Sequence, residues 1–241
     1  MKKEELIVFK SAEELANKFA GQLISWVENN SGKDFHLAIS GGKTPDLLFS
    51  VLAAKYPESD LWQNVHFWWV DERMVPPNHQ ESNFGVVQKL LFSHISIPEE
   101  NIHRIKGENN PEGEASSYST QIQENLPYAN GWPVFDLILL GMGDDGHTAS
   151  IFPDQVELLE SEQICAVATH PTSAQKRVTL TGRVINNAAK VCFLVTGENK
   201  AERILEICSN QEKANFLPAA HILPTSKILY WYVDEAAAKS P

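Results

Sequence analysis

The stretch Val134-Phe-Asp-Leu-Ile-Leu-Leu140 leads directly into Gly141-Met-Gly-Asp-Asp-Gly-His-Thr-Ala-Ser-Ile-Phe-Pro153. The apolar first segment predicts a strand that is buried inside a parallel sheet. The glycine-rich second segment places a histidine, His147, beside two carboxylates at the end of that strand. Because ligands of open α/β sheets bind outside the carboxyl ends of the strands, we expect the chemistry of this protein to take place here.

A second glycine-rich turn, Ser40-Gly-Gly-Lys-Thr-Pro45, lies far upstream between a predicted strand at 35–39 and a helical pattern of apolar residues. Free N–H groups in the first turn of a helix and the positive end of its dipole suit an anion such as phosphate. Pro45 is expected at the first helical position, and Lys43 adds a positive charge. Taken singly, the motif fits an ordinary β-to-α turn equally well.

Strand-like and helix-like segments alternate along the whole chain. Helices are expected at 12–28, after Pro45, and at 84–92, 112–126 and 200–207. Strands are expected at 6–9, 35–39, 65–70, 102–105, 134–140, 164–168, 177–180, 191–195 and 228–233. This alternation predicts an α/β fold in which helices flank both faces of a mostly parallel sheet. Since no segment has the length or composition of a linker, residues 1–241 are expected to form one domain.

Composition limits the classes of partner. The chain has 241 residues, of which 43% are hydrophobic, so it can bury a sizeable core. Its net charge of −11 argues against nucleic-acid binding, which needs clustered lysines and arginines. No signal stretch opens the sequence, and no run of about eighteen apolar residues occurs in it. We therefore expect a cytoplasmic protein with no nucleic-acid, membrane or obligate protein partner, which binds a small anionic substrate in a local pocket.

The glycines Gly141, Gly143 and Gly146 also satisfy the G-x-G-x-x-G pattern of dinucleotide-binding folds. The carboxylates of Asp144 and Asp145 would then face a pyrophosphate, and Pro153 would interrupt the following helix. In addition, no acidic residue closes the next predicted strand, at 164–168. A dinucleotide site is therefore the weaker interpretation.

His147 is a candidate general base because the pKa of imidazole lies near neutrality and a carboxylate can hold its tautomer. A turn histidine that caps backbone groups is the structural alternative. Asp144, Asp145 and His147, with Asp71 and Glu72, could instead ligate a divalent metal. The H-x-x-x-H spacing of metal sites is absent, which disfavours that alternative. The other seven histidines are expected to be structural: His36, His66, His79, His94, His103, His170 and His221.

Three cationic residues lie at predicted element ends. Arg73, in Asp71-Glu-Arg73, can bind an oxyanion through two parallel hydrogen bonds. Arg177 opens a predicted strand and Lys200 opens a predicted helix, so both could contact phosphate if these edges coincide. No serine has the G-x-S-x-G setting of a nucleophile, and no cysteine lies near a glycine turn.

Taken together, several segments resemble the 6-phosphogluconolactonase family. They are Ser40-Gly-Gly-Lys-Thr-Pro45, Trp69-Val-Asp-Glu-Arg73, Ser82-Asn83, the central motif at 141–153, Arg177-Val-Thr-Leu-Thr181 and Gly197-Glu-Asn-Lys200. The resemblance covers nearly the whole chain. It implies the Rossmann-like α/β sandwich of the glucosamine/galactosamine-6-phosphate isomerase superfamily.

The glucosamine-6-phosphate deaminases of that superfamily share the glycine turn and the G-x-G-x-D-G-H run, so they are the alternative class of enzyme. Their motif continues as H-I-A-F-N-E-P, and their strand-end pair lies in M-D-E-Y. This chain has His147-Thr-Ala-Ser-Ile-Phe-Pro153 and Asp71-Glu-Arg73 instead. The glutamate of the deaminase relay is therefore missing, which favours the lactonase.

The resemblance implies hydrolysis of 6-phospho-D-glucono-1,5-lactone to 6-phospho-D-gluconate in the oxidative pentose phosphate pathway, without metal or cofactor. His147 would be the general base on water and Asp145 would orient it. Arg73 and backbone N–H groups of the 141–146 turn would hold the oxyanion. The residues expected to bind the substrate and its phosphate are Ser40, Gly41, Gly42, Lys43, Thr44, Asp71, Gly143, Gly146, Arg177 and Lys200. A non-catalytic sugar-phosphate-binding module is the alternative outside the enzymes.

Overall fold

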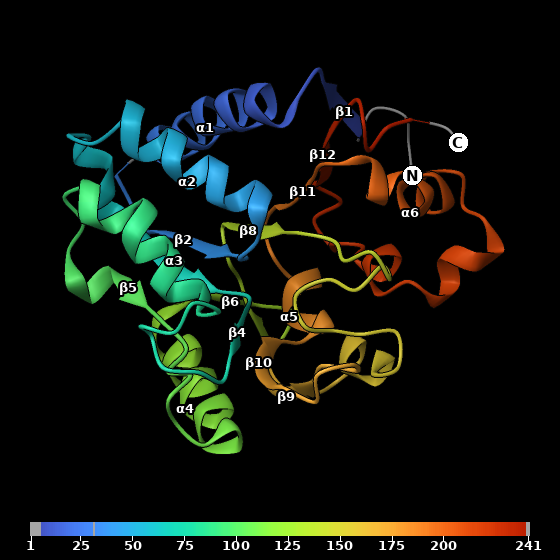
Figure 1. The fold of residues 1–241 in the computed structure, drawn as a ribbon. Helices are drawn as coiled ribbons and strands as arrows, with labels where there is room; N and C mark the ends of the chain where they lie inside the picture. The colour runs from blue at the N-terminus through green and yellow to red at the C-terminus, as the bar shows by residue number, and fades with distance from the viewer. Residues whose placement is uncertain (1–5, 31, 240–241) are drawn as a thin grey trace.

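Seven strands form one sheet in the computed structural model, which describes residues 6–30 and 32–239. Their order is β1-β12-β11-β8-β2-β3-β5, and each neighbouring pair is parallel (Figure 1). The bounds are β1 Leu6–Phe9, β2 Phe35–Ile39, β3 Val65–Trp69, β5 Ile102–His103, β8 Leu137–Leu140, β11 Val191–Val195 and β12 Leu229–Asp234. β2, β8 and β11 are buried along their whole length, as expected for central strands covered on both faces.

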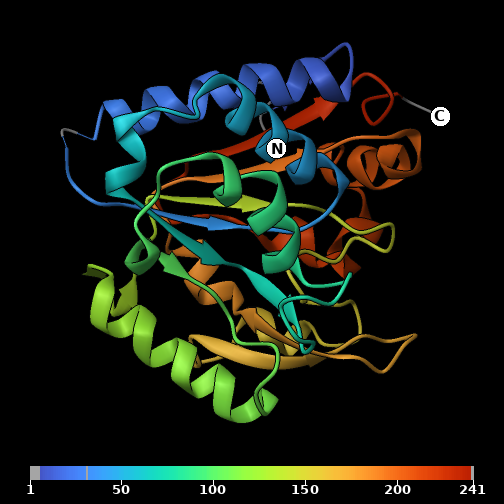
Figure 2. The same cartoon turned by 60° about the vertical axis from the view of Figure 1, so that its left-hand side comes forward.

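Helices cover both faces of this sheet, which confirms the predicted fold class. α1 and α2 lie on one side and α4 on the other in both views (Figures 1 and 2). The alternation of side chains along β3 shows the same arrangement. The Trp69 ring packs against Phe84 of α3, 5.6 Å between ring centroids, whereas the neighbouring Trp68 packs against Tyr118 of α4 at 5.8 Å. Successive strand residues face opposite sides, so the two tryptophans fill two separate layers.

The predicted helices begin and end close to the expected positions, and α5 is a short helix that was not predicted. The α-helices are α1 Ala12–Glu28, α2 Lys43–Lys55, α3 Asn83–Leu90, α4 Pro111–Asn125, α5 Gly182–Asn186 and α6 Ala201–Cys208. The short 3₁₀ helices are η2 Asp60–Asn64, η3 Phe92–His94, η4 Glu99–Asn101, η5 Val156–Leu159, η6 Glu198–Lys200, η7 Glu212–Phe216 and η8 Pro218–His221. Within the described residues, no helix is both long and apolar enough to cross a bilayer.

A second, antiparallel sheet has the order β4-β10-β9 and is formed by Asp71–Arg73, Lys176–Leu180 and Cys165–Thr169. The strands expected near 164–168 and 177–180 therefore exist, but they lie outside the parallel sheet. β4 follows β3 after a single residue, so the polypeptide passes from one sheet to the other. A two-residue ladder joins β6 (Tyr128–Ala129) to β7 (Trp132–Pro133).

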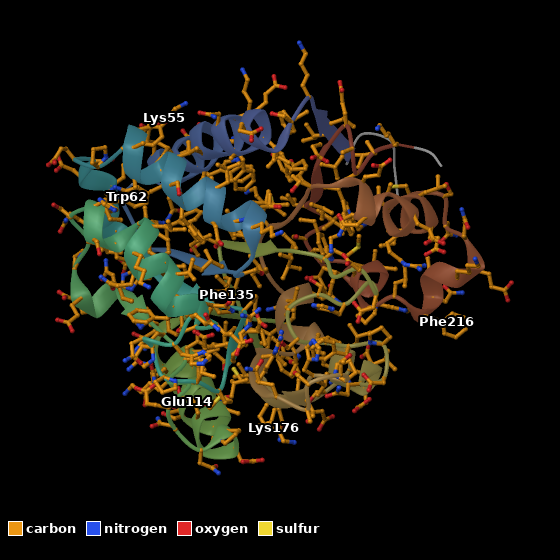
Figure 3. All side chains as sticks on the ribbon, viewed as in Figure 1. Lys55, Trp62, Glu114, Phe135, Lys176 and Phe216 are labelled. Atoms are coloured by element: carbon orange, nitrogen blue, oxygen red, sulfur yellow. The ribbon has the colours of Figure 1, made fainter. Side chains whose placement is uncertain are left out.

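Large aromatic side chains fill the core. Trp62, Trp68 and Trp69 are fully buried, and burial of apolar surface contributes about 25 cal/mol for each Å² removed from water. Figure 3 shows Phe135 inside the molecule and Phe216 at its periphery, where the Phe216 side chain is 70% exposed.

The order of the strands creates a switch point between β2 and β8. From β2 the chain continues outward to β3 and β5, whereas from β8 it continues the other way to β11 and β12. The crevice outside the carboxyl ends of two such strands is where open α/β sheets bind ligands. The turn at 40–44 follows β2, and the turn at 141–147 follows β8. Both glycine-rich motifs of the sequence therefore meet at this crevice.

Candidate active site

A cavity of about 450 Å³ opens at the switch point. It is lined by most of the residues that the sequence singled out: Ser40, Gly41, Gly42, Lys43, Thr44, Asp71, Arg73, Gly143, His147, Arg177 and Lys200. Asp145 and Gly146 do not line it, but both belong to the turn that carries His147. The strand ends and the small sheet therefore bring together residues that are up to 160 positions apart in the chain.

His147 and Asp145 form a hydrogen-bonded pair at the end of β8. His147 Nδ1 lies 2.6 Å from Asp145 Oδ1, and the same oxygen accepts the His147 backbone N–H over 3.1 Å. Burial acts to raise the pKa of the Asp145 carboxyl, but the hydrogen bond and charge of His147 outweigh it and hold this pKa at about 2. An ionised carboxylate at Nδ1 fixes the tautomer in which Nε2 is free to accept a proton.

The glycines of the 141–147 turn hold this pair in place. Gly146 has a φ of +82°, a conformation that side-chain-bearing residues rarely adopt. A Cβ on Gly143 would lie 2.2 Å from His147 Nδ1. The N–H of Gly143 donates to His147 O over 2.9 Å, and the N–H of Gly146 donates to Gly143 O over 3.1 Å. The N–H groups of Gly143 and Gly146, which the sequence suggested as donors to an oxyanion, are therefore already hydrogen-bonded inside the turn.

Asp71, Ser150 and Arg177 form a buried network on the small sheet. Ser150 Oγ donates to Asp71 Oδ2 over 2.6 Å, and Arg177 NH1 lies 3.8 Å from the same oxygen. The Arg177 guanidinium also lies over the ring of Phe152, 5.7 Å from its centroid. Burial lowers the pKa of Arg177, but arginine stays charged at neutral pH because its pKa starts above about 12. One carboxylate therefore holds this cation at the wall of the cavity.

Arg73 lies directly opposite Arg177 in the ladder between β4 and β10. Its NH1 donates to Glu81 O over 2.8 Å. Among the described residues, the Nε atoms of Arg73 and Arg177 are buried and lack a hydrogen-bond partner. Both residues line the cavity, so their guanidinium groups place two positive charges at its wall, whereas these two Nε atoms are themselves closed to solvent.

Glu72 points away from the cavity and fixes the segment that carries Arg73. Its carboxylate accepts the backbone N–H groups of Arg73, Asn83 and Phe84 at 2.8 to 2.9 Å, and the Ser82 hydroxyl at 3.1 Å. It thereby caps the start of α3, where a negative charge is favourable. Burial raises the pKa of Glu72, whereas these backbone hydrogen bonds lower it. The role of Glu72 is to position its neighbours.

The turn after β2 starts a helix as predicted, although one detail was wrong. α2 begins at Lys43 with Gly42 as its N-cap, so Pro45 is the third helical residue rather than the first. Proline has no N–H, which leaves the amides of Lys43 and Thr44 as the free donors of the first turn. The Ser40 hydroxyl donates to Leu139 O over 2.9 Å and joins β2 to β8. Its hydrogen is therefore not directed to a ligand.

Sequence reasoning missed several residues of the cavity wall. Asn83 lines it, and its side chain fills the space above Gly41, where a Cβ would lie 2.0 Å from Asn83 Oδ1. Thr196 also lines it and shares a hydrogen bond of 2.7 Å with Thr44. Asn199 also lines the cavity, as does Asp144, which the sequence suggested only as a possible metal ligand. Asn83 and Asn199 belong to the short segments Ser82-Asn83 and Gly197-Glu-Asn-Lys200, and that membership was the only signal for them.

The metal alternative is not supported by the arrangement of side chains. Within residues 6–30 and 32–239, no three histidine, cysteine, aspartate or glutamate side chains are grouped so that they could hold an ion. The carboxylates of the site are instead hydrogen-bonded to protein donors: Asp71 to Ser150, and Asp145 to His147.

The fold is that of an α/β protein in which a glycine-rich turn at the start of a helix and a histidine–aspartate pair meet at one switch point of a parallel sheet. Comparison with known proteins identifies the class further. The chain belongs to the glucosamine-6-phosphate isomerase/6-phosphogluconolactonase family, whose model matches residues 10–231. The family expected from the sequence is therefore confirmed.

Individual relatives agree with this assignment. A 6-phosphogluconolactonase of Haemophilus influenzae is 44% identical over 234 residues, which are 97% of this chain and 98% of that protein. The crystal structure of a devB protein, 41% identical, superposes with a TM-score of 0.92 over 97% of this chain and 98% of the other. A monomeric glucosamine-6-phosphate deaminase, only 18% identical, has the same fold, with a TM-score of 0.79 over 97% and 98% of the two chains.

Proposed function

We propose that the protein hydrolyses 6-phospho-D-glucono-1,5-lactone to 6-phospho-D-gluconate, a reaction of the oxidative pentose phosphate pathway. One observation carries the proposal: His147, which is hydrogen-bonded to Asp145, lines the same cavity as the turn at 40–44. The relatives named 6-phosphogluconolactonase support the reaction. We place the reaction in the cytoplasm and assign it no nucleic-acid, membrane or obligate protein partner.

His147 is the general base in this mechanism. Asp145 holds Nδ1, so Nε2 takes a proton from the water that attacks the lactone carbonyl. The proton then passes from Nε2 to the ring oxygen as the bond between this oxygen and the carbonyl carbon breaks. A positioned base of this kind contributes about 10²- to 10⁴-fold to the rate. The products are the sugar hydroxyl and a carboxylic acid, which loses its proton to solvent at neutral pH.

Arg73 is the first candidate to stabilise the negative charge that develops on the carbonyl oxygen, because it is a cation that lines the cavity. The N–H groups of Gly143 and Gly146 are engaged, so backbone donors come from the remainder of the 141–146 turn. Removing one such donor from an oxyanion site typically costs about 3 to 4 kcal/mol of transition-state stabilisation. The reaction then needs neither metal nor organic cofactor, and activity is expected to survive a chelator.

The phosphate is assigned to the start of α2, where the amides of Lys43 and Thr44 and the helix dipole favour an anion. Arg177 and Lys200 line the same cavity and supply positive charge. Substrate recognition therefore rests on the two sides of the switch point, and catalysis rests on the turn after β8.

The test is a coupled assay of freshly generated lactone, with its spontaneous hydrolysis subtracted. The proposal requires turnover above this background by the wild-type protein. Ammonia release from glucosamine 6-phosphate is measured in the same session, and it would indicate the deaminase instead. Binding of the sugar phosphate without either reaction would identify a non-catalytic module.

A further inference from the structure

The Asp144 carboxylate is held by two side chains of the cavity wall. Lys200 Nζ forms an ion pair with Asp144 Oδ1, and Asn199 Nδ2 donates to the same oxygen over 2.7 Å. The backbone oxygen of Asp144 accepts a third bond from Arg203 Nε, over 3.3 Å. Both acceptors belong to the turn after β8, and all three donors belong to η6 and α6, which follow β11. The cation that is assigned to the phosphate is thus already paired.

The two partners of this ion pair differ in exposure. The side chain of Lys200 is 17% exposed, whereas that of Asp144 is 70% exposed. Asp144 can therefore leave the pair and regain water at little cost, because exposed carboxylates are well hydrated and such pairs are weak. Lys200 lines the cavity, so it can contact either Asp144 or a ligand phosphate from the same position in the wall.

Asp144 is also charged over the pH range in which the phosphate of a sugar titrates. The hydrogen bond from Lys200 is the main cause that lowers the pKa of the Asp144 carboxyl below its usual value. Phosphate monoesters take up their second proton near about pH 6. Near neutral pH, an arriving phosphate therefore meets a fully ionised carboxylate on Lys200.

We propose that Asp144 is a built-in competitor of the ligand phosphate for Lys200, which lowers the affinity of the cavity for phosphorylated substrate and product alike. The inference rests on the phosphate-binding role of Lys200 in the proposed function. Asp144 Oδ1 takes one of the three donors of Lys200 Nζ and places a negative charge beside it. A phosphate that pairs with Lys200 therefore either displaces this carboxylate or binds against its charge, and both weaken its binding. Displacement frees Lys200 Nζ and Asn199 Nδ2, and both line the cavity.

The consequence concerns product release. The phosphate takes no part in the opening of the lactone, and it is present in both substrate and product. Binding it more tightly stabilises substrate, transition state and product equally, so it lowers KM without accelerating the chemical step. It also slows departure of the product. Because the Asp144 carboxylate competes for Lys200, it keeps the affinity for the phosphate group moderate in substrate, transition state and product.

The direct test is the dissociation constant of 6-phospho-D-gluconate, measured by calorimetry near pH 7.5. Asp144→Asn keeps the shape of the side chain and removes its charge. We expect this variant to bind about fivefold more tightly than wild type, the upper end for a partly exposed ion pair. Asp60→Asn is the matched control for net charge, because η2 precedes β3 and lies at the other end of the sheet. The control should bind as wild type does.

A double-mutant cycle with Lys200→Gln shows whether the effect passes through Lys200. Lys200→Gln alone should weaken binding about tenfold. Adding Asp144→Asn to it should then change binding by less than twofold, because no cation is left to compete for. Tightening that persists without Lys200 would mean long-range repulsion, and it would overturn the inference.

The remaining outcomes separate this inference from the proposed function. If Lys200→Gln leaves binding unchanged, the phosphate assignment and the inference both fail. If Lys200→Gln weakens binding but Asp144→Asn does not tighten it, only the inference fails. The ratio of the KM for the phosphorylated lactone to the KM for unphosphorylated D-glucono-1,5-lactone gives a further readout, and Asp144→Asn should lower this ratio. A KM that changes equally for both lactones would indicate a merely structural role and would also overturn it.

Discussion

The two ends of the parallel sheet carry histidines in opposite settings. At the carboxyl end of β8, His147 is 26% exposed to the cavity and bonded to Asp145. Near the amino ends of β2 and β3, His36 and His66 lie side by side, and His103 of β5 stacks on His66 and on Trp68. This second group is called the histidine cluster below. The imidazole of His147 is therefore accessible to a ligand in the cavity, whereas the imidazoles of the histidine cluster are packed against other rings.

The comparison shows how surroundings decide what a histidine does. In the histidine cluster, His66 Nδ1 lies 3.0 Å from His103 Nε2, and Trp68 Nε1 donates to His36 Nδ1 over 3.2 Å. Burial is the largest cause that lowers the pKa of His36 and of His103, each to about 4. These rings are therefore neutral packing elements at pH 7. His147 has a carboxylate partner and a cavity, which are the requirements of a base.

Removal of the imidazole at the cavity should have the largest effect. His147→Ala is expected to lower kcat at least about 10²-fold while the fold is kept, because the side chain is partly exposed and lies outside the core. The check is steady-state kinetics together with circular dichroism. The control His79→Ala removes an exposed histidine and should leave kcat unchanged. Near-normal turnover of His147→Ala would exclude it as the base.

Displacement of the same imidazole without removing it should have the next largest effect. Gly143→Ala places a methyl group 2.2 Å from the unmoved His147 Nδ1, so the ring must leave Asp145. We expect kcat to fall about 10- to 10²-fold, since misplacement of a catalytic group by about 1 Å can cost that much. Gly21→Ala is the matched control, because it lies in α1 away from the cavity and a Cβ there meets only Tyr56 OH, at 3.9 Å. Equal kcat values for the two variants would contradict this account of the pair.

Loss of the buried cation should affect substrate binding more than the chemical step. Arg177→Met is expected to raise KM for the phosphorylated lactone about tenfold and to lower kcat less. It should also destabilise the fold by about 3 kcal/mol, because Asp71 is left as an uncompensated buried charge. Kinetics and chemical denaturation measure the two effects. Arg183→Met makes the same exchange at a more exposed site and should change neither quantity appreciably.

The histidine cluster should affect stability and leave activity alone. The folded pKa values of His36 and His103, about 4 each, lie below the unfolded value of about 6.5, so the unfolded chain binds more protons between these limits. Stability is therefore complete above about pH 6.5 and is lost as the pH falls towards 4, by at most about 1.4 kcal/mol per pH unit for each histidine. The nearest carboxylates are Asp34, 3.6 Å from His66, and Asp136, which accepts the His36 backbone N–H.

Thermal unfolding at a series of pH values tests this expectation. His103→Phe keeps an aromatic ring against Trp68 and removes one titrating group. Its Tm should depend less on pH than that of wild type, with kcat unaffected at neutral pH. A pH dependence identical to that of wild type would mean that acid destabilises the protein elsewhere.

The parallel sheet and its helices could be predicted because periodicity is a local property. β1 and α1 were expected at the residues where they occur, and β8 was recognised from the apolar run before Gly141. The separate sheet of β4, β10 and β9 could not be predicted. An antiparallel edge strand and a parallel central strand have similar compositions, and only the partner across the ladder distinguishes them.

The candidate site shows the same division. His147, Asp145 and the two glycine turns were predictable because each lies in a short motif at the end of a strand. The bond from Ser150 to Asp71 spans 79 positions, and the pairing of Lys200 with Asp144 spans 56. No spacing rule reaches across such distances. The sequence also does not show that the backbone N–H groups of Gly143 and Gly146 are hydrogen-bonded inside their own turn.

The sequence by itself determined which segments form strands and helices, which turns can receive an anion, and which histidine stands beside a carboxylate. These properties follow from side-chain periodicity and from the backbone freedom of glycine, and both act over a few residues. Tertiary structure alone decided that β2 and β8 are neighbours, that Arg73 faces Arg177, and that Asp144 reaches Lys200. Those contacts depend on strand order, because burial of the whole core selects one arrangement from many that satisfy the local pattern equally well.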